Sequence, residues 1–367
     1  MEWWKTTIGK LVDFYVRPRN IGVSMLRAGI SLMVVLVSGF GISIAFSDKA
    51  YDTGFSISWG DGLGPVAFYT AFAIATLIIL IGVIISKRHA ALELTEKQIS
   101  RVIVVELRGL IDTSDSPLTK AVPTKITGRR ESCLIDIRRL VSGSWPNISE
   151  ALQELSHVQR HIRQIAAGSS REHITVVAGG VMQVSLLFYA GVLLDDEGRV
   201  MVFEWERANG KWEELNQPDS GRRFSIVGLE EVDAESPDVV VAVSASYQVD
   251  SMGIANTFPH IPVVHLRLPD PRPNTLMSGQ MQDELARQFT TLMGELANKS
   301  VGTAHLILAA PASLCIRLGR AYDRRNMPTI NCYQRERDQI PAYPWYVRID
   351  ASNPAQFERT PAPVIAQ

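Results

Sequence analysis

The sequence predicts a two-helix transmembrane hairpin at the N-terminus, followed by a cytoplasmic α/β domain made of two similar halves in tandem. Three observations predict this architecture. Two long uncharged runs lie close together near the N-terminus, and from residue 98 onward short β-rich runs alternate with amphipathic helical stretches. The order of those elements then repeats once along the chain. A length of 367 residues has room for two or three such domains.

Two apolar runs predict the hairpin. Ala28–Ser47 contains 20 uncharged residues and Gly62–Ser86 contains 25, and each can cross about 30 Å of hydrocarbon at about 1.5 Å per residue. A cleaved signal peptide fits poorly because a second apolar run follows the first. Two buried core helices are the alternative reading. We expect transmembrane helices over 25–47 and 62–86, joined by a short periplasmic loop over 48–61 and followed by a linker over 87–97.

The charges flanking the runs predict the orientation. Residues 1–27 hold five Lys and Arg against two acidic residues, whereas residues 48–61 hold one Lys against three Asp. The positive-inside rule places both termini in the cytoplasm. Residues 1–24 have apolar and charged positions at helical spacing and predict an interfacial amphipathic segment, unless they continue the first helix. Three unpaired cysteines suit a reducing compartment, and none of them has the CxxC spacing of a zinc or redox site.

The apolar runs contain no ionisable residue, which argues against a transporter or channel built from this hairpin alone. Small residues recur at helical spacing and predict helix association in lipid, although such residues are common in membrane helices. They are Ala67, Ala71 and Ala75 in the second run and Gly39 and Ser43 in the first. Two spans cannot enclose a pore, so perforation of a membrane would need several copies.

The remaining chain reads as a doubled α/β unit. Asn147 and Glu150 have the spacing of a capping box that opens a helix. The first half, residues 98–215, is expected to contain strands at 102–107, 134–138, 173–178 and 200–205, and helices from 147 to 167 and from 181 to 194. The second half, residues 216–350, is expected to contain strands at 239–244, 263–267, 304–309 and 329–333, and helices at 281–298 and 312–323. Residues 351–367 are expected to form a flexible tail. His173 and His305 begin strands at matching places in the two halves, and we interpret both as structural residues.

Part of the second half resembles a known family. The segment His305–Arg320 (HLILAAPASLCIRLGR), with Pro328–Tyr333 and Tyr346–Ile349, resembles the C-terminal half of a SAVED domain. The resemblance covers roughly residues 97 to 350. It implies two fused CARF-like, Rossmann-like halves that form a pseudo-dimer. A two-span hairpin ahead of such a domain is similar to the membrane-effector subclass of bacterial CBASS anti-phage proteins.

The resemblance also implies a function. We expect the SAVED domain to bind a cyclic di- or trinucleotide made by a partner nucleotidyltransferase during phage infection. Binding would induce homo-oligomerisation, and the clustered hairpins would disrupt the lipid bilayer of the inner membrane and cause abortive infection. A membrane-tethered enzyme that degrades cyclic nucleotides and a ligand-gated scaffold that recruits another effector are the rival readings.

The sequence argues against several other classes of protein, namely enzymes, metalloproteins and proteins that bind nucleic-acid polymers. There is no G-x-S-x-G, HExxH or Walker A motif and no paired Cys/His ligand set, so we expect no catalytic residues, no metal and no organic cofactor. The turn after residues 173–178 also lacks the GxGxxG of dinucleotide-binding folds. A formal charge of −1 argues against binding of nucleic-acid polymers.

The strand-to-helix turns are the candidate ligand sites, because ligands of open α/β sheets bind at the carboxyl ends of the strands and helix N-termini favour phosphate. Tight packing of small residues is the alternative. The turn residues are Gly179, Gly180 and Gln183 in the first half and Pro311, Ala312 and Ser313 in the second. The resemblance adds the loops after each half's first strand, with Arg108, Thr113, Ser244, Ser246 and Tyr247. There Arg108 could pair with phosphate and Tyr247 could stack on a base, or both could simply face solvent.

Overall fold

A computed structural model describes residues 21–38, 42–47, 54–59, 65–142, 146–195, 198–233, 236–337, 339–352 and 354–361. The chain divides into two compact units, residues 1–96 and residues 97–367. The expected interfacial segment of residues 1–24 lies outside the described residues except for its last four.

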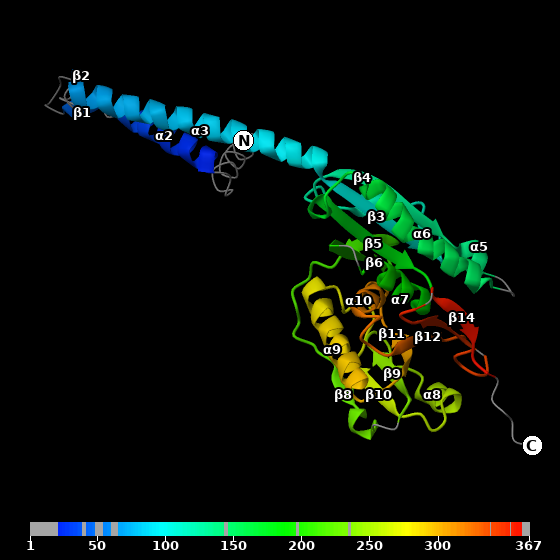
Figure 1. Cartoon of the computed structure of the whole chain (residues 1–367). Coiled ribbons are helices and arrows are strands. Elements are labelled where there is room, and N and C mark those ends of the chain that lie inside the picture. Colours follow the sequence, from blue (N-terminus) through cyan, green and yellow to red (C-terminus); the bar gives the residue numbers. More distant parts are fainter. Residues whose placement is uncertain are drawn as a thin grey trace, which may run out of the picture. The chain divides into compact units, whose positions relative to one another are not determined.

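The first unit is a helical hairpin whose connection contains a small β-hairpin (Figure 1). Helices α2 and α3 flank strands β1 and β2, which pair antiparallel from Ile42↔Trp59 to Ser47↔Gly54. The bounds are α2 (Ile21–Ser38), β1 (Ile42–Ser47), β2 (Gly54–Trp59) and α3 (Pro65–Ile99). The helical hairpin is thus confirmed.

The lengths of the hairpin elements differ from those expected. The helix predicted over 25–47 ends at Ser38, and residues 42–47 form a strand because Ile42, Ile44 and Phe46 alternate with small residues at the period of a strand. The loop expected over 48–61 contains β2. The linker expected over 87–97 lies within α3, since the good helix formers that follow residue 88 continue the helix.

Within the described residues one helix, Phe68–Ala91, is long and apolar enough to cross a membrane, and Ile21–Leu36 is a shorter apolar helix. The two helices pack through glycines. A Cβ built on Gly82 would lie 2.8 Å from the backbone nitrogen of Leu26, and one built on Gly22 would lie 2.7 Å from that of Ser86. Ala75 is fully buried. Of the small residues singled out in the sequence, Ala75 therefore serves packing within the hairpin.

The second unit contains two sheets. The first has the order β4-β3-β5-β6-β7, with β7 antiparallel to β6 and the other strands parallel. Its strands are β3 (Arg101–Arg108), β4 (Arg129–Asp136), β5 (Ile174–Val181), β6 (Arg199–Glu206) and β7 (Lys211–Glu214). The helices of this half are α4 (Leu118–Ala121), α5 (Arg138–Val141), α6 (Ile148–Ala166) and α7 (Val184–Leu193).

The second sheet repeats the first and extends it. Its order is β14-β13-β12-β11-β9-β10-β8, and the parallel core β10-β9-β11-β12 corresponds to β4-β3-β5-β6. Its strands are β8 (Ser225–Val227), β9 (Asp238–Ser244), β10 (Val263–Arg267), β11 (Thr303–Ala309), β12 (Thr329–Gln334), β13 (Trp345–Ile349) and β14 (Gln356–Arg359). The helices are α8 (Ser251–Thr257), α9 (Gly279–Asn298) and α10 (Ala312–Ala321). The doubled α/β architecture is thus confirmed.

Helices α7 and α10 join the halves (Figure 1). They contact each other, α7 also contacts β12 and β13 of the second half, and α10 contacts β5 and β6 of the first. Every residue of α7 after the first is buried, because the helix is apolar on all sides. Phe188 of α7 packs edge-on against Phe289 of α9, with ring centroids 6.3 Å apart. One continuous core therefore runs through both halves.

Several predicted details are confirmed and others are wrong. Asn147 caps α6 by accepting from the backbone nitrogen of Glu150, whose carboxylate accepts in return from the Asn147 amide. The tail expected after residue 350 contains β14, which pairs with β13 along one edge of the sheet. His173 precedes β5 whereas His305 lies inside β11, so the two histidines do not occupy matching positions.

Candidate functional site: a cleft between the two halves

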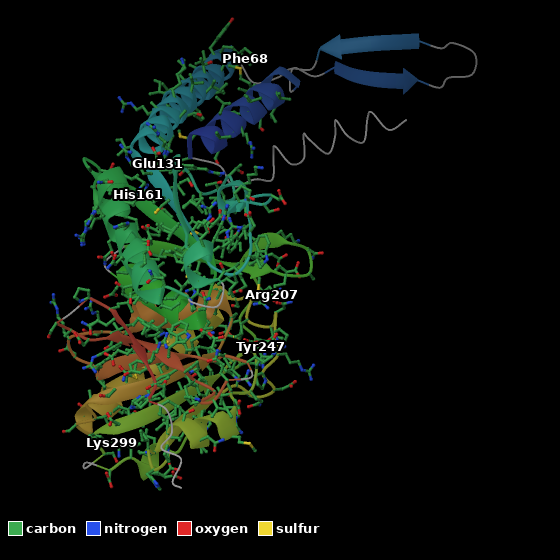
Figure 2. The ribbon with its side chains drawn as sticks, turned by 90° about the vertical axis from the view of Figure 1, so that its right-hand side faces the viewer. Phe68, Glu131, His161, Arg207, Tyr247 and Lys299 are labelled. Carbon is green, nitrogen blue, oxygen red and sulfur yellow. The ribbon has the colours of Figure 1, made fainter. Side chains whose placement is uncertain are left out.

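The carboxyl ends of strands from both sheets open into one cleft of about 490 Å³. The loops that follow parallel strands all lie at the carboxyl ends of those strands. Here the loops of the two sheets face one another across the cleft. The cleft is lined by Leu110, Gly180, Val181, Met182, Val184, Leu187, Glu204, Trp205, Arg207, Ala208, Ser246, Tyr247, Pro273, Asn274, Ala310, Pro311 and Ala312. Arg207 and Tyr247 lie on the same side of the unit (Figure 2).

Five residues singled out in the sequence line this cleft: Gly180, Ser246, Tyr247, Pro311 and Ala312. Tyr247 is 59 % exposed, so its ring is free to stack. Ser246 is held against the end of β11, because its backbone nitrogen donates to the Ala309 carbonyl at 2.9 Å.

Six others do not line it, namely Gly179, Gln183, Ser244, Ser313, Arg108 and Thr113. A Cβ on Gly179 would lie 2.8 Å from the Trp212 ring, so this glycine serves close packing. Ser244 accepts a hydrogen bond from the Val249 backbone nitrogen at 3.2 Å and shapes the loop after β9. Gln183 precedes the first residue of α7, and its Oε1 is buried without a hydrogen-bond partner among the described residues. Ser313 is fully buried behind the wall of the cleft.

Arg108 and Thr113 belong to a buried polar cluster around Glu106. The Glu106 carboxylate accepts from Arg108 Nε at 2.8 Å, from Thr113 Oγ1 at 2.5 Å and from the Leu118 backbone nitrogen at 2.7 Å. Arg108 and Glu106 are 7 % and 3 % exposed. The structure therefore gives Arg108 a carboxylate partner inside the first half, and contact with a ligand phosphate stays a prediction.

Glu204 is the polar group that connects the two halves at the cleft. It lies near the end of β6 in the first half, and its Oε2 accepts from the Ser313 backbone nitrogen in the first turn of α10 at 2.8 Å. Burial raises the pKa of the Glu204 carboxyl, while its hydrogen bonds to the start of α10 and the nearby Arg207 charge counteract the rise. The N–H of Ser313, which the sequence suggested for phosphate, is thus already occupied.

Arg207 and Trp205 complete the wall beside Glu204. The Arg207 side chain is exposed and makes no ion pair or hydrogen bond with another described residue. Trp205 contacts Trp212 of β7 edge-on, with ring centroids 5.0 Å apart, which fixes its indole. The sequence analysis missed Glu204, Trp205 and Arg207. Glu204 and Trp205 lie in the last part of β6 and Arg207 directly follows this strand, so the rule that ligands bind at the carboxyl ends of strands points to them.

A smaller hollow of about 300 Å³ adjoins the cleft at Tyr247. Its wall includes Tyr333, Tyr343 and Arg335, and the Arg335 guanidinium pairs with Asp250 at 3.1 Å. Tyr247 thus separates the two hollows. Among the described residues, no group of three His, Cys, Asp or Glu side chains is placed to hold a metal ion.

Comparison with solved structures returns SAVED/CARF-domain receptors. The Acinetobacter baumannii Cap4 receptor with the cyclic trinucleotide 2'3'3'-cAAA is 12 % identical, with a TM-score of 0.44 over 77 % of this chain and 60 % of that one. The Moraxella osloensis Cap4 receptor is 12 % identical, with a TM-score of 0.43 over 96 % of this chain and 85 % of that one. This chain thus aligns with about 60 % of the length of the Acinetobacter receptor. No curated protein matches the chain.

Two family models match. The model described as "SAVED-fused 2TM effector domain" matches residues 1–152. The model described as "SMODS-associated and fused to various effectors sensor domain", abbreviated SAVED, matches residues 158–349, which is more than half of the chain. The protein therefore belongs to the SAVED family, as a sensor of the type used in cyclic oligonucleotide signalling with a two-transmembrane effector domain ahead of it.

Proposed function

We propose that the cleft between the two halves binds a cyclic oligonucleotide of two or three nucleotides. The observation that carries this proposal is the composition of the cleft wall, where the guanidinium of Arg207 lies with Trp205 on one side and Tyr247 comes from the other half. A guanidinium pairs with phosphate and aromatic rings stack on bases. The volume of about 490 Å³ falls in the range of small-molecule sites.

The ligand in this proposal comes from a partner nucleotidyltransferase that responds to phage infection. Family membership supports a sensor of this kind. A ligand that contacts both walls of the cleft would fix the position of one half relative to the other. Because the halves are similar but not identical, a surface of the first half on one copy can meet the second half of another, and such a head-to-tail contact propagates.

The effector in this proposal is the N-terminal hairpin. Helices α2 and α3 would both cross the bacterial inner membrane with the chain termini in the cytoplasm, in accordance with the flanking charges and with the match to the 2TM effector family. Assembly of the sensors would cluster the hairpins, disrupt the bilayer and stop growth of the infected cell. No catalysis is part of this proposal.

Thermal stabilisation of the detergent-solubilised full chain against a panel of cyclic di- and trinucleotides tests the sensor step. A ligand at 100 times its dissociation constant adds about 2.7 kcal/mol of apparent stability. We expect one member of the panel to raise the Tm. Failure of every member to do so, with the protein folded, contradicts the proposal.

Two further measurements distinguish the proposed membrane effector from the two alternative functions, a scaffold and an enzyme that degrades cyclic nucleotides. Liposomes that contain the protein and a trapped dye are expected to leak when the binding nucleotide is added. Tight binding without leakage contradicts membrane disruption and favours a scaffold. Chromatography of the nucleotide after incubation is expected to return it intact, whereas linear products would show an enzyme.

A further inference from the structure

The two helices that begin at the cleft differ in the hydrogen-bond acceptors available to the N–H groups of their first turns. Val184 opens α7, Ala312 opens α10, and both residues line the cleft. Neither helix is capped by the side chain of the residue before it. The first turn of α10 nevertheless has an acceptor, because Glu204 reaches it from the other half. No side chain of the described residues accepts a hydrogen bond from the first turn of α7.

The position of Glu204 is one where a phosphate would otherwise bind. Backbone N–H groups and the helix dipole make a helix N-terminus favourable for an anion. The Glu204 carboxylate uses the Ser313 N–H at 2.8 Å and lines the cleft beside Arg207. A second anion brought to this end of α10 would lose that donor and meet a negative charge in a poorly hydrated site, where Coulomb repulsion is strong.

The corresponding position in α7 is polar and has no carboxylate hydrogen-bonded to it among the described residues. Ser185 is the second residue of α7, as Ser313 is of α10, and both side chains are fully buried. Ser313 Oγ accepts from the Gln282 amide at 2.8 Å, whereas Ser185 Oγ has no hydrogen-bond partner among the described residues. Glu204 is the only carboxylate among the described residues that line the cleft.

We infer that Glu204 determines ligand specificity by excluding phosphate from the N-terminus of α10, so that ligand phosphates bind on the Arg207 and α7 side. This inference rests on the proposed function and refines its ligand class. A phosphodiester carries one negative charge, whereas a terminal phosphate carries about −1.5 to −2 at neutral pH. The cleft therefore prefers a closed ring, whose phosphates are all diesters, over the opened strand with its extra charge.

The test compares the full-length wild type with Glu204→Gln, which removes the charge and keeps an acceptor for the Ser313 N–H. Glu206→Gln is the matched control, because Glu206 lies on the same strand outside the cleft and accepts from the Asn209 backbone nitrogen at 3.0 Å. Each protein is titrated with a cyclic trinucleotide, with its linear form bearing a terminal phosphate, and with pyrophosphate. Glu204→Ala, which also removes the acceptor, serves as the second variant if Glu204→Gln fails to fold.

We expect Glu204→Gln to lower the preference for the ring over the linear form about tenfold and to strengthen pyrophosphate binding by a similar factor. Glu206→Gln should change neither. The inference is overturned if Glu204→Gln keeps the wild-type preference for the ring and the wild-type affinity for pyrophosphate. It is also overturned if Glu204→Gln and Glu206→Gln change these two quantities equally. If the wild type binds no nucleotide, the proposed function fails, and the pyrophosphate titration still decides whether Glu204 excludes anions from this helix end.

Discussion

Gly191 and Gly319 face each other where α7 crosses α10, and each is the eighth residue of its helix. A Cβ on Gly319 would lie 2.0 Å from the Phe188 carbonyl oxygen, and one on Gly191 would lie 2.1 Å from the Ile316 carbonyl oxygen. The two contacts are equivalent in the duplicated fold, because Phe188 and Ile316 are each the fifth residue of their helix. The absence of side chains at these positions allows the helices to approach backbone to backbone, and this approach holds the two cleft walls together.

Gly319→Ala is therefore expected to destabilise the sensor unit. The added methyl has no room against backbone, and overpacking of this kind costs about 1–3 kcal/mol, occasionally more. Chemical denaturation of the full chain in detergent measures the change. Gly294→Ala in α9 is the control, because a Cβ there has nothing within 4 Å and alanine favours the helix by about 1 kcal/mol. Equal stabilities of the two variants would show that the crossing is not tight.

Arg108→Ala is expected to unfold the first half rather than to weaken ligand binding alone. The change leaves Glu106 buried at 3 % exposure without its cation, and breaking a buried ion pair costs about 3–5 kcal/mol. Urea denaturation checks this loss. The double variant Arg108→Met with Glu106→Gln should recover much of the stability. A wild-type Tm in Arg108→Ala with binding abolished would instead identify Arg108 as a ligand residue.

Gly82→Val is expected to separate the helices of the hairpin. The backbone nitrogen of Leu26 lies 2.8 Å from the position of the new Cβ, so α2 and α3 cannot keep their distance. Sensor stability and ligand binding should be unchanged, whereas ligand-induced dye release should fall several-fold. Ile81→Val, at an exposed position of the same helix, is the control. Undiminished leakage from Gly82→Val would mean that this packing is not used in the membrane.

Acid should remove the stabilisation that Asp250 provides. The Gly253 backbone N–H and the Arg335 guanidinium lower the pKa of this carboxyl below its usual value of 3.8. A group with a lowered folded-state pKa stabilises the fold above the unfolded pKa, and the contribution disappears as the pH falls through the folded value. Asp250→Asn should thus be less stable than wild type at pH 7, with the gap closing below pH 3.8. A gap independent of pH would contradict this role.

The sequence predicted the parts of the fold that have a strong period. Strands such as Val263–Arg267 and the capped helix after Asn147 were found within a few residues, because alternation and caps are local signals. Strands β7 and β14 were missed, since four-residue edge strands carry too short a pattern. The first helix of the hairpin was predicted too long because Ile42–Ser47 is apolar enough to continue a span while its alternation favours a strand.

The site was predicted only in outline. The rule that ligands bind at the carboxyl ends of strands located the edge that Gly180, Tyr247 and Pro311 occupy. It could not show that Arg108 is neutralised by Glu106 two residues earlier, because that pairing depends on both side chains being buried in the folded state. Nor could it show that Glu204 reaches across to α10, since this contact exists only once the two halves pack.

Equilibrium binding of cyclic trinucleotides to the full chain, with Arg207→Ala beside wild type, tests the central claim most directly. A charge-assisted hydrogen bond is worth about 1.5–3 kcal/mol, so Arg207→Ala should bind about 10- to 100-fold more weakly at an unchanged Tm. Arg199→Ala, at the opposite end of β6 and outside the cleft, should bind like wild type. Saturable binding that Arg207→Ala alone weakens is the predicted result. Absence of binding, or equal binding by all three proteins, would contradict a cyclic-nucleotide site in this cleft.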